Sequence, residues 1–286
     1  MIIVTGATGA LNGFTVEHLL NRIPPSDIGV SVRDPKRAQH LADRGVRVRQ
    51  GSYDEPAALR DSFADAEQVL LVSSSDVTAD VNSQHRTAID AAVEAGAKRI
   101  LYTSAHGTGF NTPYPPLAIN AAAEQYLAES GVAWTALRNG FYGHLEQLLG
   151  PWQATGTIAK PADGPFAWVD RRDAGEAAAT ILTSAEAFEG PVNLTPASPV
   201  TLTDFAAQAS ELSGRPVERI VVDDEEWVAG ELADGVPESA ARFTLAMFQA
   251  TRSNHFAQPD HTLSRLLGRE PRSIADQLAD QPVRAV

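Results

Sequence analysis

The chain has 286 residues, of which 43% are hydrophobic, enough to bury a core in one large domain or in a medium domain with a smaller partner. A formal net charge of −13 opposes general binding to nucleic acid or anionic lipid, so a small-molecule partner is expected. The absence of cysteine excludes disulfides and thiolate chemistry, and the lack of a long apolar run or a basic leader predicts a cytoplasmic protein without membrane span or signal peptide.

The first fifteen residues predict a buried strand, a glycine turn and the start of a helix. Residues 2–4 are Ile, Ile and Val, which suit a strand buried on both faces. Backbone N–H groups in such a turn and the helix dipole both favour a diphosphate, so Gly6 and Gly9 predict a dinucleotide site. Asn12 stands where the usual fingerprint has its third glycine, and Gly13 follows it. The alternative is an ordinary strand-to-helix turn that binds no ligand.

Residues 28–32 predict a second strand, which ends at Arg33. At this strand end an acidic residue would bind the ribose 2′-hydroxyl of NAD, whereas an arginine accommodates the 2′-phosphate of NADP. Arg33, with Lys36 or Arg37 behind it, therefore favours NADP, because a forked guanidinium suits a phosphate. The alternative is the solvated basic start of a helix.

Four further apolar runs predict strands that alternate with helices. The strands are expected over residues 46–50, 68–72, 99–104 and 133–137. One helix is expected to begin at Asp54 as its N-cap, the next to end at Gly96, and another to run from about Leu117 to Gly131. This alternation predicts an α/β fold with a doubly wound parallel sheet of the Rossmann type.

Polar residues follow several of these strands. Ser73, Ser74 and Ser75 come after the fourth strand, and Thr103 and Ser104 end the fifth. Ligands of open α/β sheets bind outside the carboxyl ends of the strands, so the serines are candidates for the ribose region and the other two for a wall of the nicotinamide site. Capping of a helix is the alternative role of the serines.

Composition changes after Gly150, where prolines and glycines interrupt the alternation. Residues 1–150 are therefore expected to form the NADP-binding Rossmann domain. Residues 151–286 are expected to form a smaller α+β substrate domain, and a segment near 171–195 is expected to return to the Rossmann sheet.

Five segments of the chain together resemble a known family. Residues 5–9, 31–35, 72–75, 102–104 and 137–142 resemble the NmrA-like atypical short-chain dehydrogenases, and among them the bacterial NADPH:quinone oxidoreductases of the second, QorB-like type. The resemblance covers nearly the whole chain, and Leu-Arg-Asn-Gly-Phe-Tyr at 137–142 is its most specific part. It implies NADPH binding, a small C-terminal domain, and hydride transfer to a quinone-like acceptor without flavin or metal.

The resemblance also implies contacts residue by residue. The diphosphate would meet Gly6, Ala7, Thr8, Gly9, Ala10 and Leu11, the 2′-phosphate Arg33, the ribose region Ser73 to Ser75, and the nicotinamide side Arg138, Asn139, Gly140, Phe141 and Tyr142. Two positions depart from the family pattern. Asn12 replaces the third glycine, and Ser52 stands where many relatives have an acidic residue after the third strand.

The tyrosine–lysine pair of the better-known short-chain dehydrogenases is absent, because no lysine lies four residues after any tyrosine. Asn120 aligns with a lysine of some reductase relatives, and it can hydrogen-bond but cannot act as an acid. Quinone reduction tolerates this loss, since the hydroquinone anion is delocalised, so hydride positioning is expected to dominate. Asn120 and Tyr142 are the candidate catalytic residues, although Tyr142 also suits packing. His106 and His144 are expected to be loop hydrogen-bonders, and no metal site is expected.

Two functions of different class follow. The first is an NADPH-dependent oxidoreductase acting on a quinone or similar planar carbonyl, with Phe110, Tyr114, Phe141 and Trp168 as apolar walls. The second is a non-catalytic NADP-binding redox sensor of the NmrA-like type, which signals through a protein partner. Reduction of a specialised metabolite would share the cofactor site. The protein is expected to be a monomer or a homodimer.

Overall fold

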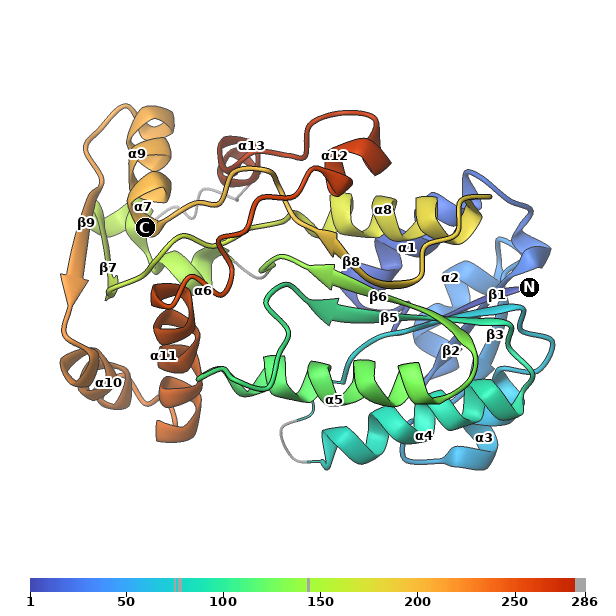
Figure 1. Ribbon diagram of the computed structural model, residues 1–286. Coiled ribbons are helices and arrows are strands. Elements are labelled where there is room, and N and C mark those ends of the chain that lie inside the picture. Colours follow the sequence, from blue (N-terminus) through green and yellow to red (C-terminus); the bar gives the residue numbers. More distant parts are fainter. Residues whose placement is uncertain (75, 77–78, 143–144, 281–286) are drawn as a thin grey trace.

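One large sheet forms the centre of the computed structural model, which describes residues 1–74, 76, 79–142 and 145–280 (Figure 1). Within these residues seven strands make up the sheet: β1 (Ile2–Thr5), β2 (Ile28–Val32), β3 (Arg47–Gln50), β4 (Gln68–Leu71), β5 (Arg99–Ala105), β6 (Ala133–Asn139) and β8 (Gly190–Leu194). All neighbours pair in parallel, in the order β3-β2-β1-β4-β5-β6-β8. The α/β class and the doubly wound parallel sheet are confirmed.

Helices cover both faces of this sheet (Figure 1). One face carries α1 (Ala10–Leu20) and α8 (Arg171–Thr183), and the other carries α3 (Pro56–Ser62), α4 (Val81–Glu94) and α5 (Pro115–Glu129). The connections include η1 (Pro25–Asp27), η2 (Pro35–Ala38) and α2 (Gln39–Ala42). α5 begins two residues before the predicted start, because proline is favourable in the first turn of a helix.

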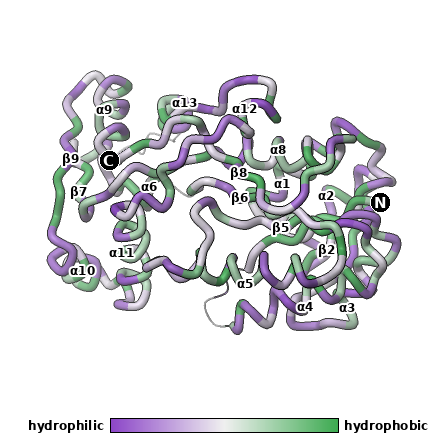
Figure 2. Tube along the Cα trace, in the orientation of Figure 1, coloured by the Kyte–Doolittle hydropathy of each residue, from purple (hydrophilic) through white to green (hydrophobic). Residues whose placement is uncertain are grey.

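Side chains of the central strands alternate between two buried layers. Val4 and Leu70 pack toward α1 and α8, whereas Ile3 and Leu71 pack toward α3, α4 and α5. In Figure 2 hydrophobic colouring gathers along the strands, while α4 alternates between hydrophobic and hydrophilic residues. Burial on both faces explains why these strands stand out in the sequence as continuous apolar runs.

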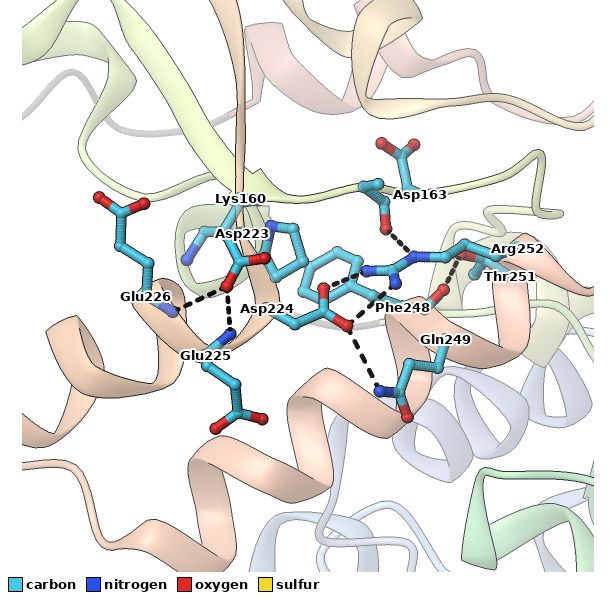
Figure 3. A network of polar contacts seen from close by, with 12 residues as sticks. Lys160, Asp163, Asp223, Asp224, Glu225, Glu226, Phe248, Gln249, Thr251 and Arg252 are labelled. Carbon is cyan, nitrogen blue, oxygen red and sulfur yellow. Dashed lines mark hydrogen bonds and ion pairs between the residues drawn. The ribbon is translucent and has the colours of Figure 1, made fainter.

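A smaller unit lies beyond one end of the large sheet, on the left of Figure 1. Its strands β7 (Thr157–Pro161) and β9 (Glu218–Val222) pair in parallel, and its helices are α6 (Leu145–Leu149), α7 (Trp152–Thr155), α9 (Leu202–Ser213), α10 (Asp224–Ala233) and α11 (Glu238–Arg252). Figure 3 shows the guanidinium of Arg252 directed at the carboxylate of Asp224, an ion pair of 2.6 Å that joins α11 to α10. Arg252 Nε also donates to the carbonyl of Ala162 at 2.6 Å, which ties both helices to the end of β7.

The chain crosses between the two units four times from β6 to α12 (Thr262–Leu267). It leaves the large sheet after β6, returns with α8 and β8, leaves again for α9, and returns at α12, which packs on α8 and β8. α13 (Ile274–Ala279) then packs against α9. Residues 171–194 therefore lie on the large sheet, whereas the division at residue 150 stays a prediction.

A buried carboxylate holds the last part of the chain in place. Asp173 in α8 is fully buried, and it pairs with Arg269 at 2.8 Å and with Arg272. Its other oxygen accepts the backbone N–H of Arg272 at 2.6 Å. These contacts fasten the segment between α12 and α13 to α8. Among the helices of the described residues, none is both long and apolar enough to cross a membrane.

Candidate functional site

A cavity of about 530 Å³ lies at the carboxyl ends of β1, β2 and β4. The strand order reverses between β1 and β4, and this switch point is where open α/β sheets bind their ligands. Its lining includes six of the residues predicted to bind cofactor, namely Gly6, Thr8, Gly9, Arg33, Ser73 and Ser74. Ser75 lies outside the described residues. The sequence prediction and the cavity therefore agree on the first, second and fourth strand ends.

The glycine turn at the base of the cavity needs its glycines. Gly6 has φ +64°, and a Cβ there would lie 2.7 Å from Cγ1 of Val72. Gly9 donates its N–H to the carbonyl of Gly6 at 2.9 Å and precedes α1 without any capping side chain. The first N–H groups of α1 thus remain available to an anion at the positive end of the helix dipole.

Asn12 has a structural role in place of the missing glycine. Its side chain is buried, and its Nδ2 donates to the carbonyl of Thr5 at 2.8 Å, joining α1 to β1. Ala7 and Leu11 pack into the core, so they would meet a ligand only through their backbones, whereas Ala10 is exposed at the start of α1. The departure from the fingerprint leaves the turn intact.

Two arginines form a basic edge of the cavity. Arg33 and Arg37 both line it and are exposed, and neither guanidinium has a hydrogen bond or ion pair within the described part of the chain. Lys36 is exposed but does not line the cavity. The second basic group beside Arg33 is therefore Arg37, one of the two alternatives that the sequence left open.

A hydrogen-bonded strap runs along another wall. Ser74 Oγ donates to Gln84 Oε1 at 2.5 Å, and Gln84 Nε2 donates to Asp54 Oδ1 at 2.9 Å. All three residues line the cavity. The prediction of Asp54 as an N-cap was wrong: Glu55 holds that position ahead of Pro56, and the Asp54 carboxylate is used by Gln84.

At the ends of β5 and β6, the predicted site residues bind one another. Ser104 Oγ donates to Glu124 Oε1 at 2.6 Å, and Arg138 contacts both oxygens of Glu124, at 3.0 and 2.6 Å. Thr103 Oγ1 accepts the backbone N–H of Ser73 at 2.8 Å. Thr103, Ser104 and Glu124 are buried. These polar groups therefore join α5 and the loop after β4 to the sheet.

Three buried polar atoms near these strand ends have no partner in the described chain: His106 Nδ1, Asn139 Oδ1 and Thr195 Oγ1. They follow or end β5, β6 and β8 respectively. Buried polar atoms are normally hydrogen-bonded, so an unpaired group of them favours contact with a ligand or water. Burial lowers the pKa of His106, which keeps its imidazole neutral. His144 lies outside the described residues.

The segment after β6 turns toward the smaller unit. Gly140 lies against Ala167, where a Cβ would come 2.7 Å from the carbonyl oxygen. The ring of Phe141 packs 4.4 Å from that of Phe256 and 6.1 Å from that of Tyr114, centroid to centroid. Of the predicted apolar walls, Phe141 and Tyr114 are thus in contact.

The other expected walls and the candidate tyrosine have different surroundings. Phe110 is 66% exposed, whereas Trp168 is buried and its Nε1 donates to Gln277 at 2.8 Å. The ring of Tyr142 lies 5.5 Å from the guanidinium of Arg171. Burial raises the pKa of Tyr142, so its hydroxyl stays protonated at neutral pH.

Asn120 is buried on α5, and its Oδ1 accepts the hydroxyl hydrogen of Tyr102 at 2.7 Å.

No group of three or more His, Asp or Glu side chains in the described residues has the arrangement of a metal site.

The model of the NmrA-like family matches residues 1–275. The chain belongs to the NmrA-like family. Quinone oxidoreductase 2 of Escherichia coli is similar to this chain: the two are 33% identical over 285 residues, which are 98% of each chain. Its crystal structure, complexed with NADPH, is similar with a TM-score of 0.90 at 32% identity, covering 98% of this NmrA-like chain and 99% of that chain.

The names of two further similar proteins refer to other substrates. Triphenylmethane reductase of Citrobacter sp., complexed with NADP(H), has a TM-score of 0.90 at 31% identity and covers 98% of this NmrA-like chain and 100% of that chain. The NAD(P)H azoreductase of Xenophilus azovorans is 27% identical over 280 residues, 96% of each chain. The predicted family is therefore confirmed over nearly the full length.

Proposed function

We propose that this NmrA-like protein is an NADPH-dependent oxidoreductase that transfers hydride to a quinone or a similar planar carbonyl acceptor. The observation that carries the cofactor assignment is the cavity at the switch point. In the described part of the chain, no side chain caps the helix N-terminus at its base, and the guanidinium groups of the two arginines at its edge have no partner. The relatives named as NADPH-dependent quinone oxidoreductase and triphenylmethane reductase support hydride transfer to a conjugated organic acceptor.

The cavity fits the phosphates of NADPH at two places. Gly6, Thr8 and Gly9 would form the base on which the diphosphate lies, and the first backbone N–H groups of α1 would bind it. Arg33 and Arg37 would hold the 2′-phosphate by charge-assisted hydrogen bonds. NADH lacks that phosphate, so these two arginines would set the preference between the cofactors.

At the other end of the cofactor, the chain offers neutral hydrogen-bond donors. When bound, NADPH supplies the hydride, and quinone reduction needs one proton in addition. Asn120 and Tyr142 are the candidates for contact with the acceptor oxygen, and the protonated phenol of Tyr142 can donate. Residues 151–286, the proposed substrate domain, supply much of the apolar surface near Phe141. We further propose that the acceptor is a small molecule, that the protein lies in the cytoplasm, and that it is a monomer or a homodimer.

Turnover is tested by following NADPH absorbance with and without a panel of quinones. We expect consumption that depends on quinone and is faster with NADPH than with NADH. An Arg33→Ala protein serves as the comparison, because we expect it to retain quinone-dependent turnover while its preference for NADPH over NADH is weakened. Binding of NADPH without consumption by any quinone would reject the enzyme and favour the redox sensor.

A further inference from the structure

A chain of buried hydrogen bonds leads from the cavity wall to Asn120. The backbone N–H of Ser74 donates to Nε2 of His85 at 2.8 Å. Nδ1 of His85 lies 3.3 Å from the hydroxyl oxygen of Tyr102, which in turn lies 2.7 Å from Oδ1 of Asn120. The side chains come from α4, β5 and α5, and the three residues are 3%, 1% and 7% exposed.

The direction of every bond in this chain is fixed by its first donor. A backbone N–H only donates, so Nε2 of His85 carries no proton, and the neutral imidazole has its hydrogen on Nδ1. That hydrogen points to the oxygen of Tyr102, and the Tyr102 hydroxyl then donates to Asn120 Oδ1. Burial lowers the pKa of His85 to about 4, which agrees with a neutral ring.

This direction determines which end of the Asn120 amide is left over. Oδ1 accepts the hydrogen of the Tyr102 hydroxyl, and this is the one side-chain hydrogen bond of Asn120 within the described residues, which leaves Nδ2 unused. The free end is therefore a donor. A donor stabilises negative charge that develops on an acceptor oxygen during hydride transfer, whereas a carbonyl in the same place would repel it.

We propose that His85 and Tyr102 are positioning residues, which orient the Asn120 amide so that Nδ2 donates to the oxygen of the quinone-like acceptor. Because the first bond comes from Ser74 in the cavity wall, the orientation of Asn120 is set by the loop that borders the cofactor. This inference rests on the proposed oxidoreductase activity.

The kinetic test compares two tyrosines with similar bonds. Tyr102→Phe removes the hydroxyl that orients Asn120, while Tyr126→Phe, on α5, removes a surface hydroxyl that donates to Asp90 at 2.8 Å. We expect Tyr102→Phe to lower kcat for quinone by roughly tenfold, which corresponds to one hydrogen bond lost in the transition state, with little change in the Kd of NADPH. Tyr126→Phe should leave both unchanged.

A double-mutant cycle shows whether the two residues act together. If Tyr102 acts through Asn120, Tyr102→Phe combined with Asn120→Ala should be no slower than Asn120→Ala alone. Multiplying effects would overturn the proposal. His85→Gln, which keeps a neutral acceptor for Ser74 and a donor for Tyr102, should retain more kcat than His85→Ala; equal losses would also overturn it.

A measurement without turnover separates this inference from the proposed activity. In the ¹⁵N spectrum of the full protein with NADP⁺, the Asn120 side-chain amide should shift on addition of a hydroquinone. The same shift should be weak or absent in Tyr102→Phe protein that circular dichroism shows to be folded. An unshifted amide in the wild type would reject the role of Asn120. A shift in protein that consumes no NADPH would leave the positioning intact and reject only the enzyme.

Discussion

The two ends of the candidate site use their polar side chains in opposite ways. Around the glycine turn and β2, Arg33 and Arg37 line the cavity, and their guanidinium groups have no partner among the residues that the structure describes. At the ends of β5 and β6, Ser104 and Arg138 are both bound to the buried Glu124. A side chain already paired inside the protein gains little by binding a ligand. We therefore expect the first region to supply cofactor affinity and the second to hold the sheet ends in position.

The largest expected effect is at Gly6, in the first region. Gly6→Ala introduces a methyl group 2.7 Å from Val72 at a φ of +64°, so the turn must move. At ~1–3 kcal/mol of strain this should weaken NADPH binding by roughly 100-fold, measured by titration of cofactor fluorescence. Gly131→Ala is the control, because its φ is +77° but the space around it is open. Equal losses in both proteins would mean that backbone strain alone, not the cavity, decides binding.

The next effect concerns stability, in the second region. Glu124→Ala removes the partner of Arg138 and Ser104. The free energy of unfolding in urea should fall by about 2–3 kcal/mol, less than the roughly 3–5 kcal/mol of a fully buried pair, because Arg138 is partly exposed. Glu129→Ala, exposed on the same helix, should change it by less than about 0.5 kcal/mol. NADPH affinity lost without any loss of stability would show that Glu124 and Arg138 belong to the cofactor site instead.

Arg33 tests which region selects the cofactor. Arg33→Ala should reduce the preference for NADPH over NADH by roughly 10- to 100-fold, or about 1.5–3 kcal/mol, because it removes a charge-assisted contact that NADH never makes. NADH binding should barely change. Lys36→Ala removes a neighbouring charge that does not line the cavity and should have little effect. If the Kd values of both cofactors rise equally in Arg33→Ala, the residue has a structural role.

His85 links the two regions and should make stability depend on pH. Burial lowers its pKa from the ordinary 6.5 to about 4, so as pH falls through this window the unfolded chain binds a proton that the folded protein does not. The free energy of unfolding should therefore decrease by on the order of 1–2 kcal/mol between about pH 7 and pH 5. His85→Gln should flatten the decline, although His18 and His106, whose pKa values burial also lowers, still contribute. Identical slopes would place the acid sensitivity elsewhere.

The smallest effect is expected at Tyr142. Its hydroxyl has no hydrogen bond in the described part of the protein, and Tyr142→Phe keeps the ring that packs beside Arg171. Quinone turnover should fall by less than about tenfold, or ~1.4 kcal/mol, because water can deliver the proton to a delocalised anion. A loss of several hundredfold in steady-state kcat would instead identify Tyr142 as the required donor.

What the sequence predicted well follows from local chemistry. The strand at 28–32 matches β2 residue for residue, since a strand buried on both faces leaves an unbroken apolar run. Gly6 and Arg33 were placed at the cavity because both belong to a strand end whose position follows from the alternation of strands and helices.

What the sequence did not predict depends on partners far away along the chain. Ser104 and Arg138 reach the same carboxylate from two strands, and the sequence does not show that Glu124 lies between them. Asp54 is of a residue type that often caps a helix, yet its carboxylate accepts a hydrogen bond from Gln84 on α4. Strand ends can be located from periodicity alone, but the packing of a helix decides which side chains there remain free for a ligand.

The repeated crossing of the chain between the two units limits how the protein can move. A simple hinge needs one or two connecting segments, whereas here four segments join the units between β6 and α12. Rotation of the smaller unit would have to bend all of them together and strain the Asp173 contacts that fasten the segment between α12 and α13 to α8. Substrate entry is therefore expected to depend on rearrangement of individual loops, with the two units keeping a nearly constant orientation through each reaction cycle.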